Sequence, residues 1–293
     1  MPHRQAPAGR MSTVLGRKLG GELHRLRDTS GLSQPQAAAA LTATQTKIAK
    51  IERGVSPVRE PDLHTLCDLY GVARNSPLRN RFLALAHADR QRRRASGWWK
   101  EYSALGDLVE YIQLEDGAST IRTYQNHLVP GLLQTAQYAR AVASADDVWQ
   151  DADEVEHFVQ ARLARQARLT RENPLQLHAV VCEAALRQQV GGRTTMRFQL
   201  QRLVEASAMP NVTLQVLPFS AGAHASMTGP FVIVGFDEPT SLDVVYVETA
   251  GTTLWLESEE DAERHRGLFD NVCRSALSPD ESRTLISDLT EEM

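Results

Sequence analysis

Residues 31–54 constrain the fold more than any other stretch, because two short helical patterns occur there with a tight polar turn between them. The first pattern begins at Ser33, a side chain that commonly caps helix N-termini, and Gln36 three residues later completes a capping box. Pro35 falls in the first turn, where a missing backbone N–H costs little. This part of the chain therefore predicts a short, well-capped helix.

The second pattern begins at Thr44, again a capping residue, and ends at Gly54, a residue that often follows a helix C-terminus. Ile48 and Ile51 are three positions apart and mark its buried face. Two short helices joined by a tight turn indicate a helix-turn-helix, with residues 44–53 as the helix that enters the major groove of DNA.

The outward face of this second helix carries side chains that can bind DNA. Gln45 can make two hydrogen bonds to adenine, and Lys47 or Lys50 can donate to guanine or to phosphate. The alternative is that these are ordinary exposed polar residues. The residues expected at the DNA, including the cap of the second helix and two arginines expected at phosphates, are Gln34, Thr44, Gln45, Thr46, Lys47, Lys50, Arg53 and Arg59.

Charge is distributed unevenly along the chain. The formal net charge is −4, yet residues 1–100 contain 18 Lys and Arg against 7 Asp and Glu, and residues 101–293 contain 14 against 29. A basic N-terminal third on an acidic remainder fits a DNA-binding domain joined to a domain that does not bind DNA. A basic surface without a partner is the alternative, and it does not explain why the charge coincides with the helix-turn-helix.

Length and composition set further limits. A chain of 293 residues is long enough for two domains. It contains no apolar stretch long enough to span a membrane, and its first ten residues lack the apolar core of a secretory signal. The three cysteines have no metal-ligand or redox spacing. We expect a cytoplasmic, nucleoid-associated protein with no membrane association, metal or cofactor.

The helix-turn-helix resembles that of the Cro/CI-like (xenobiotic-response-element) regulators. The resemblance rests on Gly31-Leu32-Ser33-Gln34 at its start and Ile51-Glu52-Arg53-Gly54 at its end. It implies an all-α domain of five short helices. Two positions depart from the family pattern: Ala37 replaces a large apolar residue, and Thr42 replaces a turn glycine. We expect a locally thinner core at Ala37, and at Thr42 either a turn without positive φ or a strained one.

The expected organisation is α+β overall. Apolar spacing predicts helices throughout the N-terminal third, and alternating apolar runs between helices predict a larger, mixed α+β C-terminal domain. A basic segment with four arginines connects them, either as a helix that touches DNA or as a solvated connector. The domains are a disordered tail (1–12), the helix-turn-helix domain (13–88), a basic linker (89–97) and an α+β regulatory and dimerisation domain (98–293).

The larger domain resembles the C-terminal domain of the WhiJ-like, antitoxin-like regulators of filamentous actinomycetes. Four motifs carry the resemblance in order, namely Trp98-Trp99 with Tyr102, the run from Val129 to Thr135 with Tyr138-Ala139, Val216-Leu217-Pro218-Phe219 with Gly222-Ala223-His224, and Val245-Tyr246-Val247-Glu248. The resemblance implies control of development or secondary metabolism. It also implies a small companion protein, encoded nearby, that binds the regulator and relieves its hold on DNA.

Within this domain the residue pattern supports binding more than catalysis. No nucleophile elbow, phosphate loop or metal-ligand spacing occurs, so we expect no enzyme activity. The aromatic and leucine pairs are more often core than ligand-binding, although an apolar ligand pocket is possible. Candidate ligand or partner residues are Trp98, Trp99, Leu132, Leu133, Glu183, His224 and Glu248.

The leading interpretation is a sequence-specific transcriptional regulator, with repression as the expected outcome. A palindromic operator in double-stranded DNA, read by a homodimer, would supply the specificity that one small domain lacks. The C-terminal domain would dimerise and receive the signal from the companion protein. The alternatives are a regulator that senses a small molecule and the antitoxin of a toxin–antitoxin-like pair.

Overall fold

The computed structural model describes residues 12–94, 98–105, 107–145, 151–236, 243–249 and 252–293. The chain forms two compact units, one from residues 1–97 and 237–242 and one from residues 98–236 and 243–293. We call them the head and the body, and describe each by itself. Residues 1–11 of the predicted tail, and residues 95–97 of the predicted linker, lie outside the described part of the chain.

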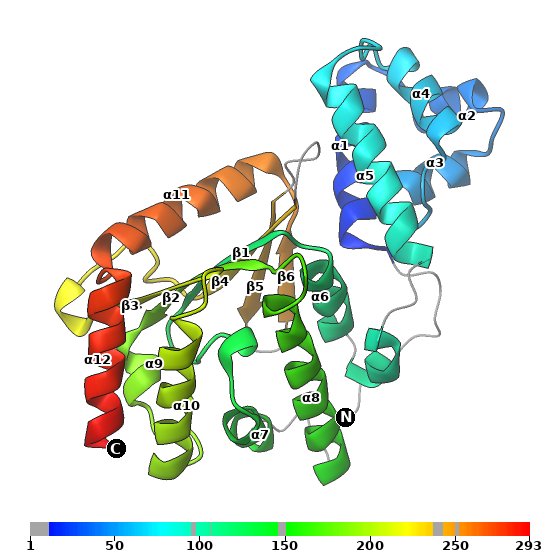
Figure 1. The fold of residues 1–293 in the computed structure, drawn as a ribbon. Helices are drawn as coiled ribbons and strands as arrows, with labels where there is room; N and C mark the ends of the chain where they lie inside the picture. Colours follow the sequence, from blue (N-terminus) through cyan, green and yellow to red (C-terminus); the bar gives the residue numbers. More distant parts are fainter. Residues whose placement is uncertain (1–11, 95–97, 106, 146–150, 237–242, 250–251) are drawn as a thin grey trace. The chain divides into compact units, whose positions relative to one another are not determined.

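Five helices make up the described part of the head, as expected. They are α1 (Val14–Thr29), α2 (Gln34–Ala40), α3 (Gln45–Glu52), α4 (Glu60–Leu69) and α5 (Pro77–Arg94) (Figure 1). The predicted caps are confirmed: Ser33 and Gln36 form the capping box of α2, and the Thr44 hydroxyl accepts from the Lys47 backbone N–H at the start of α3. The helix-turn-helix is thus α2, a short turn and α3.

The two departures from the family pattern lie at a buried position and in a turn. Ala37 is fully buried in a core built mainly from leucine and isoleucine. Thr42, in the turn between α2 and α3, has φ of 49°, so the strained alternative is the correct one. Gly54 has φ of 68° after α3, and a Cβ there would overlap the backbone of Arg17. Only glycine fits at that close approach of α1.

The basic segment after residue 88 continues α5 and is bound to the head. Arg93 donates to the backbone oxygens of Gly54 and Val55 at 2.6 and 3.2 Å, and Arg90 donates to that of Val58 at 2.7 Å. Asp89, 2% exposed, accepts from Arg93. Arg90 and Arg93 therefore hold the chain that follows α3, and the segment through Arg94 is helical.

The body combines helices with a single sheet in its described part. Before the third strand come η1 (Trp98–Leu105), α6 (Asp107–Asp116), β1 (Thr120–Gln125), η2 (Gly131–Leu133), α7 (Ala136–Ser144), α8 (Ala152–Arg165), η3 (Gln166–Leu169), β2 (Gln176–Cys182), α9 (Glu183–Arg187) and α10 (Arg193–Ala206). Then come β3 (Val212–Leu217), η4 (Phe219–Ala221), β4 (Phe231–Gly235), β5 (Val244–Thr249), β6 (Thr252–Leu256), α11 (Glu259–Ser275) and α12 (Pro279–Glu292). The all-α head and mixed α+β body confirm the predicted fold class.

The six strands are ordered β3-β2-β1-β4-β5-β6. β1, β2 and β3 are parallel, whereas β4 pairs antiparallel with β1, β5 with β4, and β6 with β5. The chain builds the sheet outward from β1 in one direction, then crosses to the other side of β1 to place β4. The strand order therefore reverses at β1, and open sheets commonly bind ligands at the carboxyl end of such a strand.

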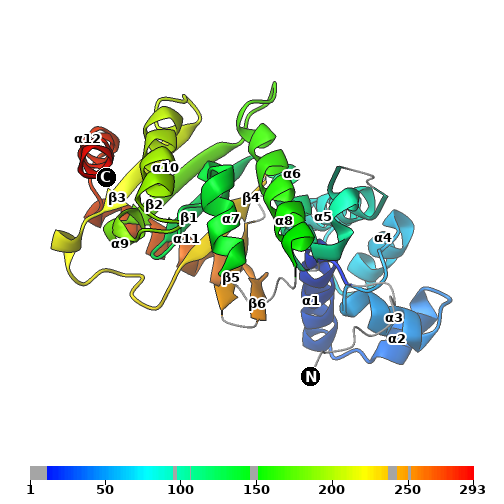
Figure 2. The same cartoon turned by 90° about the horizontal axis from the view of Figure 1, so that it is seen from below.

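Alternate side chains of the strands face opposite layers of helices. Tyr124, Val180 and Phe231 lie on the face covered by α11, where they pack with Phe269 and Val272. The other face lies under α7, α8 and α10 (Figures 1 and 2), and α12 packs beside β3 and α10. No helix among the described residues is long and apolar enough to cross a membrane.

Candidate functional site

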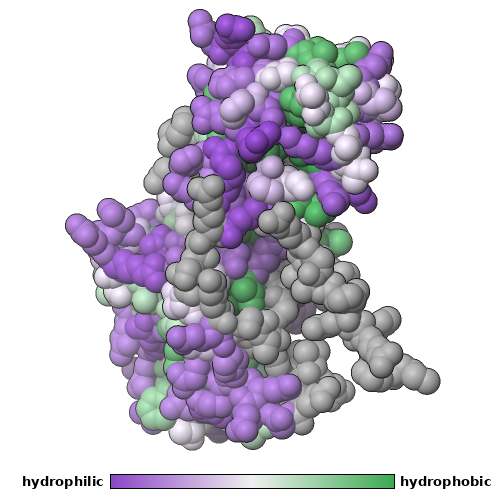
Figure 3. Space-filling model, turned by 90° about the vertical axis from the view of Figure 1, so that its right-hand side faces the viewer, coloured by the Kyte–Doolittle hydropathy of each residue, from purple (hydrophilic) through white to green (hydrophobic). Residues whose placement is uncertain are grey.

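The α3 face of the head presents polar side chains to solvent. Thr44, Gln45, Thr46 and Lys50 are exposed, and Lys47 is partly buried. The side of the head that carries α2 and α3 is mostly hydrophilic around an apolar patch (Figure 3). Exposure and polarity on one short helix are what contact with base edges and phosphates requires.

A buried ion pair beneath this face holds Gln45 in position. Arg27 of α1 donates to the Glu52 carboxylate at 2.6 Å, and each side chain is at most 7% exposed. Gln34 also donates to Glu52, at 2.8 Å, and Gln45 donates to Gln34 at 3.4 Å. A chain of hydrogen bonds thus connects the core of the head to an expected base-reading side chain.

Glu52 stays ionised in this environment. Burial raises the pKa of its carboxyl, but hydrogen bonds from Arg27, Gln34 and His24 outweigh burial, and the pKa ends below its ordinary value. The negative charge of Glu52 matters because a neutral Glu52 would bind Arg27 and Gln34 less strongly. Sequence reasoning identified Gln34 and Gln45 but missed Glu52 and Arg27, which position them.

Asp62 of α4 draws two expected DNA-binding residues together. Lys47 lies 2.8 Å from its carboxylate, and Arg59 donates to both of its oxygens at 3.1 Å. Burial raises the pKa of Asp62, but the hydrogen bonds from Arg59 and Lys47 outweigh burial and lower the pKa overall. Lys47 and Arg59 therefore lie side by side at the Asp62 carboxylate, which also reduces the net positive charge of this part of the surface.

Arg53, at the end of α3, donates to the Ala49 backbone oxygen at 3.1 Å and is otherwise exposed. Its guanidinium retains further N–H groups for a phosphate. The eight residues expected at DNA lie on α2, in the turn before α3, on α3 and in the α3–α4 connection.

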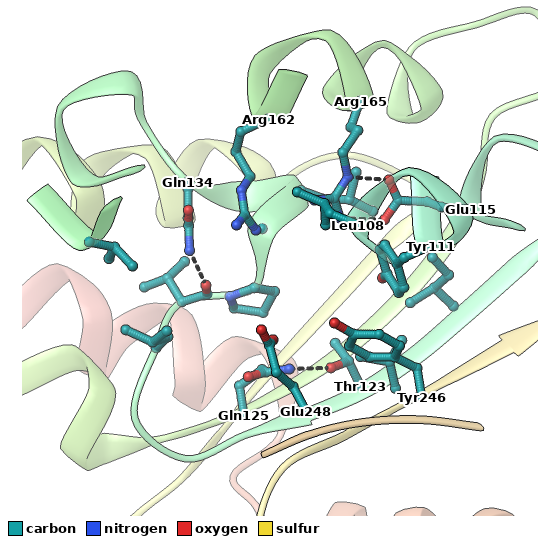
Figure 4. Close-up of a pocket in the computed structure, with 18 of the residues that line it drawn as sticks. Leu108, Tyr111, Glu115, Thr123, Gln125, Gln134, Arg162, Arg165, Tyr246 and Glu248 are labelled. Atoms are coloured by element: carbon teal, nitrogen blue, oxygen red, sulfur yellow. Dashed lines mark hydrogen bonds and ion pairs between the residues drawn. The ribbon is translucent and has the colours of Figure 1, made fainter. Parts of the chain in front are cut away.

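The body contains a cavity of about 400 Å³ on the sheet face opposite α11. Alternation along the strands puts every second residue into its floor. The floor consists of Ile121, Thr123, Gln125, Leu177, Val232, Tyr246, Glu248 and Thr253. Its walls come from α6, the 128–134 segment, α7 and α8 (Figure 4). The cavity adjoins Gln125, the last residue of β1, where the strand order reverses.

Two arginines one helical turn apart on α8 differ in their partners. Arg165 donates to both oxygens of Glu115 at 2.6 and 2.8 Å, and lies over the Tyr111 ring. Arg162 points into the cavity (Figure 4), and within the described residues its guanidinium makes neither hydrogen bond nor ion pair. Its nearest aromatic contact is the Phe158 ring, 4.6 Å from the guanidinium carbon. Among the described residues that line the cavity, Arg165 is thus paired with a carboxylate and Arg162 is not.

The aromatic and leucine candidates of the body divide between core and cavity. Trp98 and Trp99 pack in an apolar cluster with residues of α6, α7 and α8. Leu133 is fully buried, and the neighbouring Leu132 lines the cavity. The Pro-Gly-Leu-Leu motif thus contributes one leucine to each environment.

The three polar candidates do not form one site. Glu183 is 8% exposed and accepts from Arg187 and from the Phe219 backbone N–H. His224 contacts the Tyr124 hydroxyl at 3.3 Å. Glu248 alone of the three lines the cavity. Sequence reasoning missed Arg162, and the only signal it offered was an arginine near the inner stripe of a long helix.

The described residues would need several His, Cys, Asp or Glu side chains close together to ligate a metal ion. No group of three or more His, Cys, Asp or Glu side chains there is placed to hold one.

Comparison with known families agrees with the division into head and body. A helix-turn-helix domain model matches residues 18–76, which places the chain among the DNA-binding transcriptional regulators. A second model, described as a domain of unknown function (DUF5753), matches residues 108–288, more than half of the chain, and the protein belongs to this family. Searches of curated proteins and of solved structures found no match.

Proposed function

We propose that this protein is a repressor that binds a palindromic operator as a homodimer. The observation that carries the proposal is the exposed polar face of α3, held in position from below by Arg27, Glu52 and Gln34. Gln45 reads base edges, Lys50 donates to guanine or to a phosphate, and Thr46 contacts a thymine methyl or a phosphate. Gln34, Arg53 and Arg59 bind phosphates and set the register.

Dimerisation follows from how little DNA one head covers. α3 has eight residues, so a single head contacts only a few base pairs. Two heads on half-sites about one helical turn apart multiply the specificity. The body, which is the larger unit and carries the acidic charge, is the dimerising element in this proposal, and DNA contact stays confined to the heads.

The signal in this proposal is a small companion protein that binds the body and releases the operator. Its support is the WhiJ-like, antitoxin-like resemblance. Co-purification of the full chain with the product of the adjacent small gene tests this part. A complex that lowers operator affinity supports it, whereas no association at micromolar concentration contradicts it.

The DNA-binding part is tested by selecting the preferred duplex from a random pool with the full chain. We expect an enriched palindrome with half-sites one turn apart. In fluorescence anisotropy, Gln45→Ala costs about 1–3 kcal/mol for the selected duplex and much less for a scrambled one. Lys50→Ala weakens both and reduces the salt dependence if it binds phosphate.

Arg74→Ala is the matched control, because Arg74 is 82% exposed and lies in the connection between α4 and α5. It should leave the affinity for the selected duplex unchanged. Equal losses on selected and scrambled duplexes for Gln45→Ala would contradict the assignment of Gln45 as a base reader. An enriched sequence without two-fold symmetry would contradict the dimer.

A second candidate is regulation by a small molecule, and the cavity in the body favours it. Its volume lies within the range of small-molecule sites, and its lining mixes apolar side chains with a few polar groups. In this candidate the ligand, rather than a companion protein, changes the affinity of the regulator for its operator.

A further inference from the structure

The cavity in the body concentrates unsatisfied polar atoms. Among the described residues, three buried side-chain atoms lack a hydrogen-bond partner, namely Gln134 Oε1, Arg162 Nε and Arg168 Nε. The first two belong to residues that line the cavity. Unpaired buried polar groups are costly, so two of them in one cavity need an explanation beyond folding.

The orientation of Gln134 makes its free atom an acceptor. Its amide nitrogen donates to the Val129 backbone oxygen at 2.8 Å, which leaves Oε1 as the free end. Arg162 offers N–H donors. A ligand that fills the cavity therefore meets a free cationic donor from α8 and a free neutral acceptor from the segment after β1 (Figure 4).

Gly131 makes room for the Arg162 guanidinium. A Cβ at residue 131 would overlap Nη1 of Arg162, so the glycine allows the guanidinium to lie against the backbone of the Pro-Gly segment. The glycine of the Pro-Gly motif at residues 130–131 is therefore needed to leave space for this guanidinium. Burial, with a smaller contribution from the charge of Arg165, lowers the pKa of Arg162 to about 10, and the group therefore remains a cation at neutral pH.

The other charges of the cavity do not occupy Arg162. Glu115 is already bound to Arg165 on both oxygens. Glu248 faces the cavity from β5 without forming an ion pair with Arg162 within the described residues, and its side chain is exposed. The apolar lining from Leu108, Phe158, Leu177 and Val232 surrounds these groups. A carboxylate on an apolar body matches this combination.

We propose that the cavity is a binding site for a small organic carboxylate, with Arg162 holding the carboxylate and Gln134 Oε1 accepting from a donor on the ligand. The proposal names a class of ligand for the second candidate function, in which a small molecule regulates the protein. It rests on the regulator assignment only for its consequence at the operator, because binding itself concerns the body alone.

The test uses two probes of equal shape, 4-(trifluoromethyl)benzoate and the uncharged 4-(trifluoromethyl)benzamide, titrated into the full chain by fluorine NMR. We expect the carboxylate to bind about 10-fold more tightly than the amide, as a charge-assisted hydrogen bond implies. Arg162→Met should abolish this preference. Arg264→Met is the control, since Arg264 is 68% exposed on α11, and it should keep the preference.

Two further variants test the geometry without removing Arg162. Gly131→Ala displaces the guanidinium and should reduce the preference for the carboxylate. Glu248→Gln removes the opposing negative charge and should tighten carboxylate binding by about 3-fold, with the amide unaffected. A gain in affinity cannot arise from misfolding, so this variant keeps the proposal falsifiable if the others unfold.

The proposal is overturned if the full chain binds both probes equally, binds neither at millimolar concentration, or keeps its carboxylate preference in Arg162→Met. Duplex binding is measured on the same preparations. Absence of the carboxylate preference with intact duplex binding contradicts this site alone. Absence of selected-duplex binding with an intact carboxylate preference contradicts the proposed DNA function alone.

Discussion

Arg27 in the head and Arg162 in the body are both shielded from solvent, but they differ in their hydrogen-bond partners. Arg27 donates to Glu52 through two nitrogens, to the Leu32 backbone oxygen at 2.7 Å, and lies 2.7 Å from Asp28. Arg162 makes no hydrogen bond or ion pair within the described residues. The fold thus supplies hydrogen-bond acceptors for the guanidinium of Arg27, whereas the described residues supply none for that of Arg162.

The pKa shifts of the two arginines follow this difference. The hydrogen bond to Glu52 raises the pKa of Arg27, whereas burial lowers that of Arg162. A raised pKa means that the folded state stabilises the charged form, and a lowered one means that the fold bears a cost for keeping it. The two pKa shifts therefore distinguish an arginine that the fold stabilises as a cation from one whose charge the fold disfavours.

The largest expected effect is on the satisfied arginine of the body. Arg165→Met leaves Glu115, which is 1% exposed, as a buried charge without its partner, and should lower the free energy of unfolding by about 3–5 kcal/mol. Urea unfolding followed by tryptophan fluorescence measures it, because all four tryptophans follow residue 97. Arg264→Met should change the value by less than about 0.5 kcal/mol. A loss for Arg165→Met as small as that of this control would contradict the ion-pair argument.

The corresponding change in the head is somewhat smaller. Glu52→Gln keeps the shape but removes the anion that Arg27 and Gln34 bind, and should destabilise the head by about 3 kcal/mol. Circular dichroism detects it, since the described head is helical and contains no tryptophan. Duplex affinity should fall under conditions where the variant is still folded, because Gln34 no longer orients Gln45. Unchanged affinity would show that the hydrogen-bond chain does not position the reader.

Acid should destabilise the head through the same carboxylates. The pKa values of Glu52 and Asp62 are lowered in the folded state, so the unfolded chain binds more protons than the folded one as the pH falls. Their contribution is complete above about pH 5, declines through the ordinary carboxyl range near 4, and is lost below the folded pKa values. Helix unfolding in urea from pH 7 to pH 3 should show this, with a shallower slope in Glu52→Gln. Equal slopes would exclude Glu52 as a source.

Features set by neighbouring residues were predictable from the sequence. The caps at Ser33 and Thr44 and the positive φ at Gly54 depend on contacts within about four positions, so residue type and spacing were enough to find them, whereas the close approach of α1 to Gly54 was not visible in this way. The strands of the body were likewise recognisable as short apolar and β-branched runs between turns; β3 and β4 are buried at almost every position because helices cover both faces of the sheet.

Features set by distant residues were not predictable in this way. Arg27 and Glu52 are 25 positions apart, and Arg162 meets Gly131 across 31 positions. Nothing local distinguishes Arg162 from Arg165 in the sequence, although one is paired and the other is not. The order of the strands in the sheet decides which residues lie together in the floor of the cavity. The sequence of one strand can show which of its side chains share a face, but it does not show which strand lies next to it.

The smallest expected effect on stability, the Arg264→Met control aside, is that of Arg162→Met, and it tests the difference between the two kinds of arginine most directly. The change removes no hydrogen bond or ion pair within the described residues, and it relieves the cost of enclosing a cation, which offsets the lost contact with the Phe158 ring. We expect the free energy of unfolding to stay within about 1 kcal/mol of the parent, against the loss of several kcal/mol for Arg165→Met three positions away. Tryptophan fluorescence in urea measures both. A loss for Arg162→Met that approaches that of Arg165→Met would mean that the fold itself uses the Arg162 charge, and the difference between a structural arginine and a binding arginine would disappear.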